Sequence, residues 1–296
     1  AAQGKLIYLE WIRAIGQQAV AKLALEQAVA HRKAAELGKL AGVVSGADVL
    51  RLQAQEAQAT HLVNSAAAFV AMTEERVRLA LHMPATQKLT LGVDVLSPAA
   101  ATKKLPTLAS LKAAALKNRL ELAALQKTVK SLQEVESATA SAYVPRVSAF
   151  GGALYANPNP RLFPQKERFD LTWEVGLRVT WTVNSLFSTR GAVRETAAQV
   201  SVLKQRAQAL RDGIQAAVVT AYYELQTARS ARTAAQMQIT AAKASLAAMR
   251  QLFIGGKANA VQIIDAETAL TRARLQRVNA HIDLLAAQIK LDHATG

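Results

Sequence analysis

The sequence predicts a mainly α-helical protein in which long antiparallel helices flank a single β-hairpin. Three observations support this fold class: long stretches rich in alanine and without proline, one segment with strict alternation of apolar and polar residues, and an internal repeat of the helical parts. The composition agrees, because 51% of the 296 residues are hydrophobic but only 5% are aromatic. That balance favours helices packed closely side by side over one large globular core.

Long helices are predicted over five ranges. Between Gly191 and Phe253 the chain has no proline and one interior glycine, Gly213, and its Ala, Gln, Arg, Leu and Glu residues are good helix formers. Helices of that length are rare in compact domains and common in coiled coils. Similar compositions predict four more helices, over about residues 5–37, 47–81, 108–142 and 260–294. The range 84–106, which contains Gly92 and Pro98, is predicted to be a small irregular region.

The range 143–183 is predicted to form the β-hairpin. Apolar and polar residues alternate from Leu171 to Val183, which predicts a strand with one apolar and one polar face. Trp173 and Trp181 lie on the apolar face, roughly 26 Å apart along the strand, and this spacing approaches that of two membrane aromatic girdles. An ordinary hairpin on a soluble core would show the same alternation. The first arm, 144–155, alternates less clearly, and the connecting loop, 156–168, is polar.

The two ends of the chain are predicted to be copies of one another. A shift of 214 residues aligns them without a gap and pairs Tyr8 with Tyr222, Glu10 with Glu224, Gly42 with Gly256 and Ser45 with Asn259. Ser45 with Asp48, and Asn259 with Gln262, have the spacing of an N-cap and the third helical residue. Each copy is therefore predicted to be a helical hairpin. Because the first copy has no strands upstream, we expect the complete gene product to be longer.

Charge and residue types narrow the possible functions. The net charge of +15 allows nucleic acid or an anionic membrane as a partner. The chain has no cysteine and five histidines, none with a metal-ligand spacing, so we expect the histidines on helix surfaces and no metal site. No pair of carboxylates suggests a general acid and base, which predicts no enzyme and no cofactor. A structural coiled-coil scaffold and a basic helical nucleic-acid-binding protein remain as alternatives to a membrane protein.

Five short motifs, in order along the chain, resemble the TolC family of outer-membrane efflux and secretion channels. They lie at residues 42–50 and 256–266, which are similar to that family's two periplasmic tips, at 118–122, and at 143–148 and 173–177, which are similar to the start and return of a membrane hairpin. In the 118–122 motif, Leu120 replaces the family's proline. The resemblance covers nearly the whole chain.

The resemblance implies a homotrimer with a long α-barrel and a shared 12-stranded β-barrel, to which each protomer would contribute four strands. Residues 1–83 would be the periplasmic helical hairpin of the first repeat, 84–106 part of the equatorial region, and 107–142 a helix of the second repeat. Residues 143–183 would be an outer-membrane hairpin, and 184–296 the long helix and second periplasmic hairpin. The implied function is a passive export duct in the outer membrane that works with a periplasmic adaptor protein and an inner-membrane pump, without nucleic acid.

Specific positions are also implied by the resemblance. The periplasmic gate would include Asp48, Phe253, Lys257, Ala258, Gln262 and Asp265. Phe253 and Ala258 stand where the family's best-known member has a tyrosine and an arginine that help to close the aperture, and Gln262 replaces one of its two entrance aspartates. The tips that dock the adaptor would contain Gly42, Ser45, Gly256 and Asn259, and the membrane girdle Trp173 and Trp181.

Overall fold

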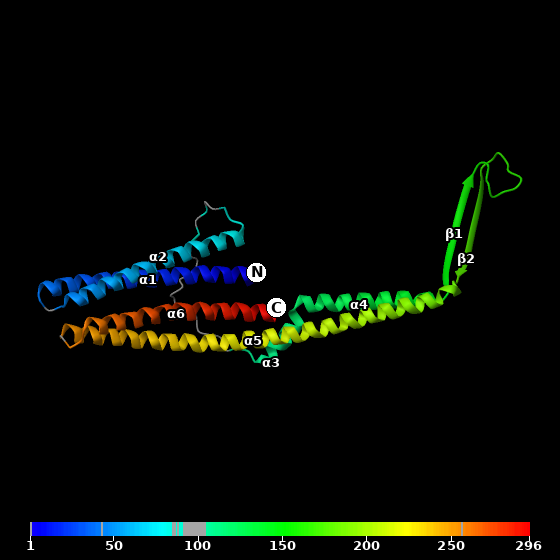
Figure 1. Ribbon diagram of the computed structural model, residues 1–296. Helices are drawn as coiled ribbons and strands as arrows, with labels where there is room; N and C mark the ends of the chain where they lie inside the picture. Colours follow the sequence, from blue (N-terminus) through cyan, green and yellow to red (C-terminus); the bar gives the residue numbers. More distant parts are fainter. Residues whose placement is uncertain (1, 43, 85–86, 88, 91–104, 256) are drawn as a thin grey trace. The chain divides into compact units, whose positions relative to one another are not determined.

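The computed structural model describes residues 2–42, 44–84, 87, 89–90, 105–255 and 257–296. The chain divides into two compact units, one of Ala1–Asn118 with Ile214–Gly296 (unit 1) and one of Arg119–Gly213 (unit 2). Figure 1 shows the helices and the hairpin coloured along the sequence. Most of the range 84–106, which was predicted to belong to an equatorial region, lies outside the described residues.

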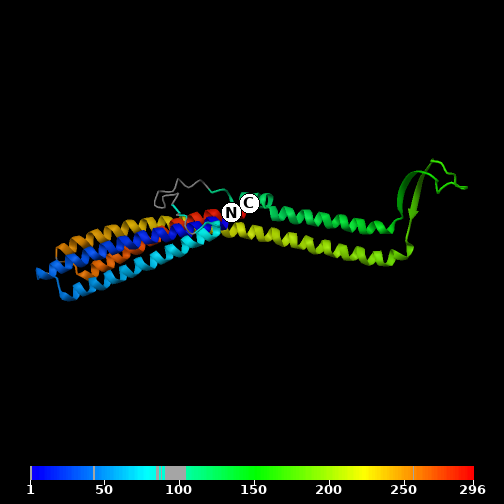
Figure 2. The same cartoon turned by 90° about the horizontal axis from the view of Figure 1, so that it is seen from above.

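Unit 1 is a row of long helices. Its described residues form α1 (Ala2–Leu40), α2 (Gly46–Leu81), α3 (Leu108–Asn118), the C-terminal part of α5 (Leu186–Ile254) and α6 (Ala260–Thr295). Four of these helices pack together, since α1 contacts α2 and α6, and α6 shares a buried cluster with α5. Figure 1 shows them in the order α2, α1, α6 and α5, and Figure 2 shows the same helices from above. None of the helices in the described ranges has the apolar length that a bilayer crossing requires.

The helices of unit 1 pack through small side chains at coiled-coil spacing. Helix α1 buries four alanines at intervals of seven residues, Ala14, Ala21, Ala28 and Ala35. Helix α6 buries residues at alternating intervals of four and three, namely Ala280, Leu284, Ala287, Leu291 and Ala294. A seven-residue repeat of buried positions is that of a coiled coil, and small side chains at the contact shorten the distance between helix axes.

Helices α1 and α6 approach closely at Gly16. A Cβ atom added there would lie 2.8 Å from a γ-carbon of Val278, which is nearer than two carbon atoms can pack. One and two turns earlier on α1, Ile12 and Leu9 are buried against Ile282. Gly16 therefore permits the contact that joins the first helical hairpin to the second.

The helix boundaries confirm the predicted repeat. Helix α1 ends at Leu40 and α5 at Ile254, 214 residues later, and the same shift relates the starts of α2 and α6 at Gly46 and Ala260. Within the helices, Ala14 and Ala21 correspond to Ala228 and Ala235, and all four are buried. The two hairpins are thus built on one pattern of turn and core positions.

The helix predicted over 108–142 is divided, which corrects the expectation of a single rod. Helix α3 ends at Asn118, Arg119 has an extended backbone with ψ 111°, and α4 (Leu120–Ala140) then begins. Helix α3 packs on α6, and its last residue contacts the chain end at Gly296. The helix propensity of the range is unbroken, so these tertiary contacts of α3 explain the break.

Unit 2 contains the β-hairpin. Strand β1 (Arg146–Ala156) pairs antiparallel with β2 (Asp170–Thr180), from Arg146 opposite Thr180 to Ala156 opposite Asp170. Short 3₁₀ turns, η1 (Ser141–Tyr143) and η2 (Val183–Ser185), connect the strands to α4 and α5. The antiparallel hairpin confirms the prediction for this part of the chain.

The two faces of the hairpin differ in polarity. One face carries the apolar side chains of β2, all of them exposed: Leu171, Trp173, Val175, Leu177 and Val179. In β1 the residues opposite them, which are every second residue from Val147 to Tyr155, are also apolar. Val175, in the middle of β2, has 78% of its surface exposed. The described residues of the chain thus leave a continuous apolar face uncovered, as a lipid-facing strand would.

The opposite face explains why alternation in the first arm is weak. The Phe150 ring lies over Gly176, where an added Cβ would approach the ring to 2.6 Å, and the Arg178 guanidinium is 5.3 Å from the ring centroid. Phe150 therefore belongs to the polar face, where it fills the space that Gly176 leaves.

The loop of the hairpin is fixed by one buried side chain. Asn159 is 1% exposed; its Nδ2 donates to the carbonyl of Asp170 at 2.8 Å, and its Oδ1 accepts from the N–H of Arg161 at 3.0 Å. Arg161 also pairs with Glu174 at 2.8 Å.

Strand β2 is shorter than predicted. It ends at Thr180, so Trp181 lies beyond the strand instead of on its apolar face. The chain turns there towards η2 and α5, and backbone pairing stops where β1 begins at Arg146. Trp173 does lie on the apolar face, 76% exposed.

We expect Gly16→Ala to destabilise the protein by about 1–3 kcal/mol, because the new methyl group overlaps Val278, whose β-branched side chain has few alternative rotamers. The matched control is Gly213→Ala in α5, where a Cβ would meet nothing within 4 Å. That change should stabilise the helix by about 0.5–1 kcal/mol. Thermal unfolding in mild detergent measures both, and equal stability of the two variants would contradict the close contact.

Candidate functional site

The tip of the first hairpin is a tight turn between α1 and α2. Helix α1 ends at Leu40, and Gly42 follows with φ +76°, a left-handed conformation that glycine adopts without a steric cost. The N–H of Gly42 donates to the carbonyl of Lys39 at 3.0 Å, and that of Val44 to the carbonyl of Gly38 at 3.3 Å. These bonds satisfy carbonyl groups that the helix end would leave without partners.

Both tips begin their second helix with a side-chain cap. The Ser45 Oγ accepts from the N–H of Asp48 at 3.1 Å. At the second tip, Asn259 Oδ1 accepts from the N–H of Gln262 at 3.1 Å, and Gln262 Oε1 accepts from the N–H of Asn259 at 3.0 Å. The two N-caps predicted from the sequence are confirmed, and the second is a reciprocal capping box.

The two tips meet in one apolar cluster. Ala35 of α1 and Val49 and Leu52 of α2 are buried together, and Val44 from the first tip and Ile264 from α6 pack against them. The beginning of the second hairpin's return helix is thus held against the first hairpin. These side chains connect the two tips by direct contact.

Asp48, a predicted gate residue, contacts its own tip. Its carboxylate accepts from the Ser45 Oγ at 2.6 Å and from Arg51 at 3.4 Å, and its side chain is 23% exposed. The sequence did not predict that Arg51 would partly balance this charge.

The other predicted gate residues surround the second tip. Lys257 and Asp265 are exposed, Phe253 and Ala258 are partly buried, and Gln262 is exposed and forms the capping box. The N–H of Lys257 donates to the carbonyl of Leu252 at 2.8 Å. Gly256, which the resemblance placed at the docking tip, lies outside the described residues.

A buried carboxylate joins three helices a few turns from the tips. Glu267 of α6 is 6% exposed, and its Oε1 contacts His31 Nε2 of α1 and accepts from Arg250 Nη2 of α5 at 3.2 Å. Arg274 of α6 donates to Gln27 Oε1 of α1 at 3.4 Å, which is a second polar contact between these two helices. Burial lowers the pKa of Arg274, Glu267 opposes that shift and Arg250 adds to it.

This cluster corrects one expectation from the sequence. The histidines were expected on helix surfaces, but His31 is partly buried, and Glu267, which it contacts, is buried. The signal was present, because Glu267 lies four residues after Ile263 and three before Leu270, both of which are buried. That spacing places Glu267 on the core face of the helix.

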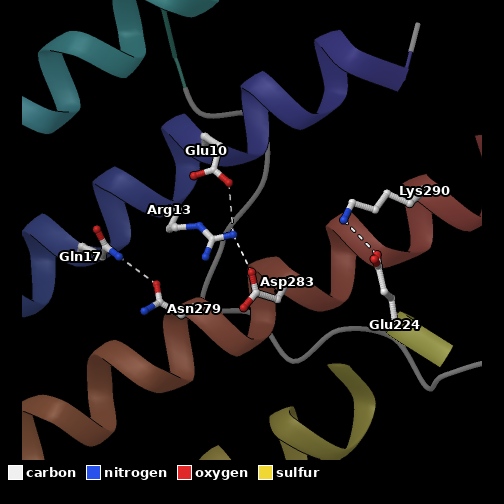
Figure 3. Close-up of polar contacts among 7 residues, drawn as sticks. All are labelled: Glu10, Arg13, Gln17, Glu224, Asn279, Asp283 and Lys290. Carbon is white, nitrogen blue, oxygen red and sulfur yellow. Dashed lines mark hydrogen bonds and ion pairs between the residues drawn. The ribbon is translucent and has the colours of Figure 1, made fainter. Parts of the chain in front are cut away.

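Further polar contacts bind α6 to its two neighbours away from the tips (Figure 3). Arg13 of α1 bridges Glu10 at 3.3 Å and Asp283 at 2.7 Å. Gln17 donates to Asn279 at 2.8 Å, and Lys290 pairs with Glu224 of α5 at 2.9 Å, as the labelled sticks in Figure 3 show. Glu10 and Glu224 are the pair that the sequence repeat aligns; Glu224 pairs directly with Lys290 of α6, whereas Glu10 contacts Arg13, which in turn pairs with Asp283 of α6.

His281 is the second histidine that is not on the surface. It is partly buried, and its pKa is lowered by burial first and then by the charges of Arg232 and Arg277. The histidine is therefore held in its neutral form over a wider pH range than a free side chain.

Comparison with known families identifies the chain. Residues 111–296 match the family described as outer membrane efflux protein. The chain belongs to this family. No curated protein sequence matches it.

Solved structures of outer-membrane channels share the fold of this efflux protein chain. The channel OprN matches all of it with 21% identity and a TM-score of 0.79. The open-state MtrE channel of Neisseria gonorrhoeae matches 99% with 16% identity and a TM-score of 0.77, and VceC of Vibrio cholerae matches all of it with 13% identity and a TM-score of 0.76. The chain spans 65%, 65% and 69% of their respective lengths.

The family confirms the resemblance and the fold class inferred from the sequence. It is a family of efflux proteins, which describes transport and not catalysis, and it places this chain in the outer membrane. The channel hypothesis is thereby favoured over a structural scaffold or a nucleic-acid-binding protein. The family does not identify the gate residues or the docking tips.

We expect Glu267→Ala to destabilise the efflux protein by about 3 kcal/mol, because it removes a buried carboxylate and leaves the Arg250 guanidinium and the His31 ring without their acceptor. Asp265→Ala, two residues earlier on the same helix and exposed, is the matched control and should change stability by less than about 0.5 kcal/mol. Urea unfolding followed by circular dichroism compares the two. If both variants unfold at the wild-type midpoint, Glu267 does not join the three helices.

Proposed function

We propose that the full-length protein is a passive export duct through the outer membrane and the periplasm. The observation that carries this proposal is the hairpin, whose apolar face is exposed along its whole length, while most of the other described residues form long helices. An exposed apolar face of this length suits contact with lipid. The long helices would form the wall of a periplasmic tunnel.

The hairpin alone is incomplete as a membrane structure. In lipid, each backbone N–H and C=O group needs a partner, so a sheet that spans the membrane has to close on itself. The described residues contain a two-stranded sheet with two open edges. We infer a homotrimer in which three copies of the full-length protein together close a 12-stranded barrel, as the resemblance implies.

The tips are the proposed contact with the other parts of the export machinery. Gly42, Ser45, Gly256 and Asn259 would dock a periplasmic adaptor protein, which connects the duct to an inner-membrane pump. The capped turns support this role, because they present a fixed backbone at the end of each helical hairpin. No catalytic chemistry is required, since passage through a pore depends on its width and on the charges that line it.

We further propose that the gate lies at the same end, with Asp48 and Asp265 as its acidic groups and Phe253, Lys257, Ala258 and Gln262 around them. Asp265 and Lys257 are exposed. The apolar contact of Ile264 with the first tip would tie the movement of the second hairpin to that of the first.

Removal of the two entrance carboxylates should make the channel less selective for cations. We expect the double variant Asp48→Asn and Asp265→Asn to reduce cation selectivity and block by divalent cations, while the backbone caps remain, because Asp48 contributes its N–H to the cap. Asp292→Asn, an exposed acid at the other end of α6, is the control. Single-channel recordings in planar bilayers measure selectivity and block, and unchanged values would remove both residues from the gate.

The lipid-facing assignment predicts opposite results for two charged substitutions in the hairpin. Val175→Asp introduces a carboxylate in the middle of the apolar face, which costs on the order of 2 kcal/mol in the bilayer, so we expect the trimer to fail to assemble in membranes. Ser148→Asp lies on the other face, opposite Arg178, and should assemble normally. Membrane fractionation with heat-modifiable electrophoresis tests both, and normal assembly of Val175→Asp would contradict lipid contact.

The function itself is tested by native mass spectrometry and by conductance of the full-length protein extracted from its membrane. Three copies per complex, and ion-conducting pores after reconstitution, are the expected results. A monomer or dimer that is stable without detergent and forms no pores would overturn the export duct.

A further inference from the structure

The polar face of the hairpin has balanced charges near its loop. Strand β2 carries the two acidic residues of the sheet, Asp170 and Glu174, and both lie on this face. Each of them pairs with an arginine of the loop, Glu174 with Arg161 at 2.8 Å and Asp170 with Arg168 at 3.1 Å. The acidic charges of the sheet are thus compensated by the hairpin itself.

The other end of the same face, where the strands join the helices, carries two arginines without an acidic partner. Arg146 and Arg178 are both exposed, and neither forms an ion pair with any described residue. In the register Arg146 is opposite Thr180 and Arg178 is opposite Ser148, so the two arginines are diagonal neighbours on one face. Diagonal neighbours on an antiparallel pair lie roughly 7–8 Å apart, within reach of one another's long side chains.

The adjoining parts of the chain do not supply an acid. The segments 137–146 and 175–194, which contain this end of the strands and lead into α4 and α5, hold four arginines and no aspartate or glutamate. The other two arginines, Arg190 and Arg194, are exposed in the first turns of α5. The positive charge at the base of the hairpin therefore has no counterpart nearby in the sequence.

Arg178 is held in position without being neutralised. Its guanidinium lies 5.3 Å from the centre of the Phe150 ring, and that ring fills the space above Gly176. A cation–π contact orients a guanidinium but leaves its charge and its edge N–H groups available to an acceptor. Two guanidinium groups so close together suit the oxygen atoms of a carboxylate or a phosphate, which a planar fork binds in a bidentate manner.

The proposed function determines where this pair of arginines points. The apolar face of the hairpin is the one that would meet lipid, so the polar face would line the interior of the barrel. Three copies would each bring Arg146 and Arg178 to the same level of the pore. Rings of basic side chains are the arrangement by which pores select anions.

We propose that Arg146 and Arg178 form a basic ring inside the duct that attracts and binds anionic solutes with carboxylate or phosphate groups. This inference rests on the proposed function, because it needs a pore closed by three copies. It is separate from the proposed gate, since Asp48 and Asp265 belong to unit 1 and the two arginines to unit 2.

The first test measures ion selectivity of the full-length trimer in planar bilayers with a gradient of KCl. We expect the double variant Arg146→Gln and Arg178→Gln to lower the ratio of chloride to potassium permeability by about threefold to tenfold, because the local excess of anions is lost. The difference should shrink at high salt, since the field of a charge extends roughly 10 Å at about 0.1 M but only roughly 3 Å at about 1 M. Ser148→Asp, which places a carboxylate opposite Arg178, should change the ratio in the same direction.

The second test measures binding, with tripolyphosphate as the probe. It should block the current of the wild-type channel, and the double glutamine variant should need about tenfold to a hundredfold more of it, as expected for lost hydrogen bonds to a charged group. The variant Arg146→Lys and Arg178→Lys keeps both charges. It should keep the permeability ratio but bind tripolyphosphate less tightly, because an ammonium group lacks the planar fork.

The matched control is the double variant Arg161→Gln and Glu174→Gln. It removes one positive and one negative charge from the same hairpin and leaves its net charge unchanged, so selectivity and block should stay as in wild type. Heat-modifiable electrophoresis verifies that each variant is assembled. Equal permeability ratios and equal block in wild type and the double glutamine variant would overturn the proposal, and so would an equal change in the control.

The same recordings separate this proposal from the proposed function. If the wild-type protein conducts but its selectivity does not depend on the two arginines, the export duct stands and the basic ring is wrong. If the wild-type protein forms no pores, the export duct itself is wrong.

Discussion

The helical part of this efflux protein depends on one constraint, the close approach of helices that bury small residues every seven positions. Alanines at this spacing in α1 bring its axis close to the axes of its neighbours. Gly16 has no side chain, which avoids a clash with Val278 of α6. The short distance then brings long side chains within reach of the next helix. The pairing of Arg13 with Asp283 and the burial of Glu267 between α1 and α5 are consequences of that packing.

The hairpin follows a different constraint. Its strands have no core to bury their apolar side chains, and the polar face is stabilised locally, by Phe150 on Gly176 and by the loop bonds of Asn159. These local contacts hold the two strands together on the polar face, while the apolar face stays exposed in the described part of the chain. One chain thus combines helices that bury their apolar positions with strands that expose them, and this combination suits a protein that lies partly in water and partly in membrane.

Patterns that are local in the sequence predicted the fold well. The long helices, the hairpin and the two N-caps follow from composition, from period-two alternation and from Ser45 and Asn259 at capping positions. The break at Arg119 could not be predicted in this way, because it arises from contacts of α3 with α6, which are distant in sequence. The end of β2 before Trp181 depends likewise on where its partner strand begins.

The candidate site was predicted less completely than the fold. The resemblance indicated the residues at the tips, but it could not show that Arg51 contacts Asp48 or that Gln262 completes a capping box. The cluster of Glu267, His31 and Arg250 was missed, because glutamate, histidine and arginine are each common on solvated helix faces. Only the position of Glu267 between Ile263 and Leu270 pointed to the core.

The two capped turns also have an evolutionary consequence. The first uses serine with aspartate and the second uses asparagine with glutamine, and both hold the start of a helix with a side-chain oxygen at the cap. At the third helical position, the backbone N–H makes the capping bond whichever side chain is present. A duplicated hairpin can therefore exchange a carboxylate for an amide at its tip without a change in the turn. Selection can adjust the charge at the ends of the helical hairpins one residue at a time, separately from the stability of the helices that carry it.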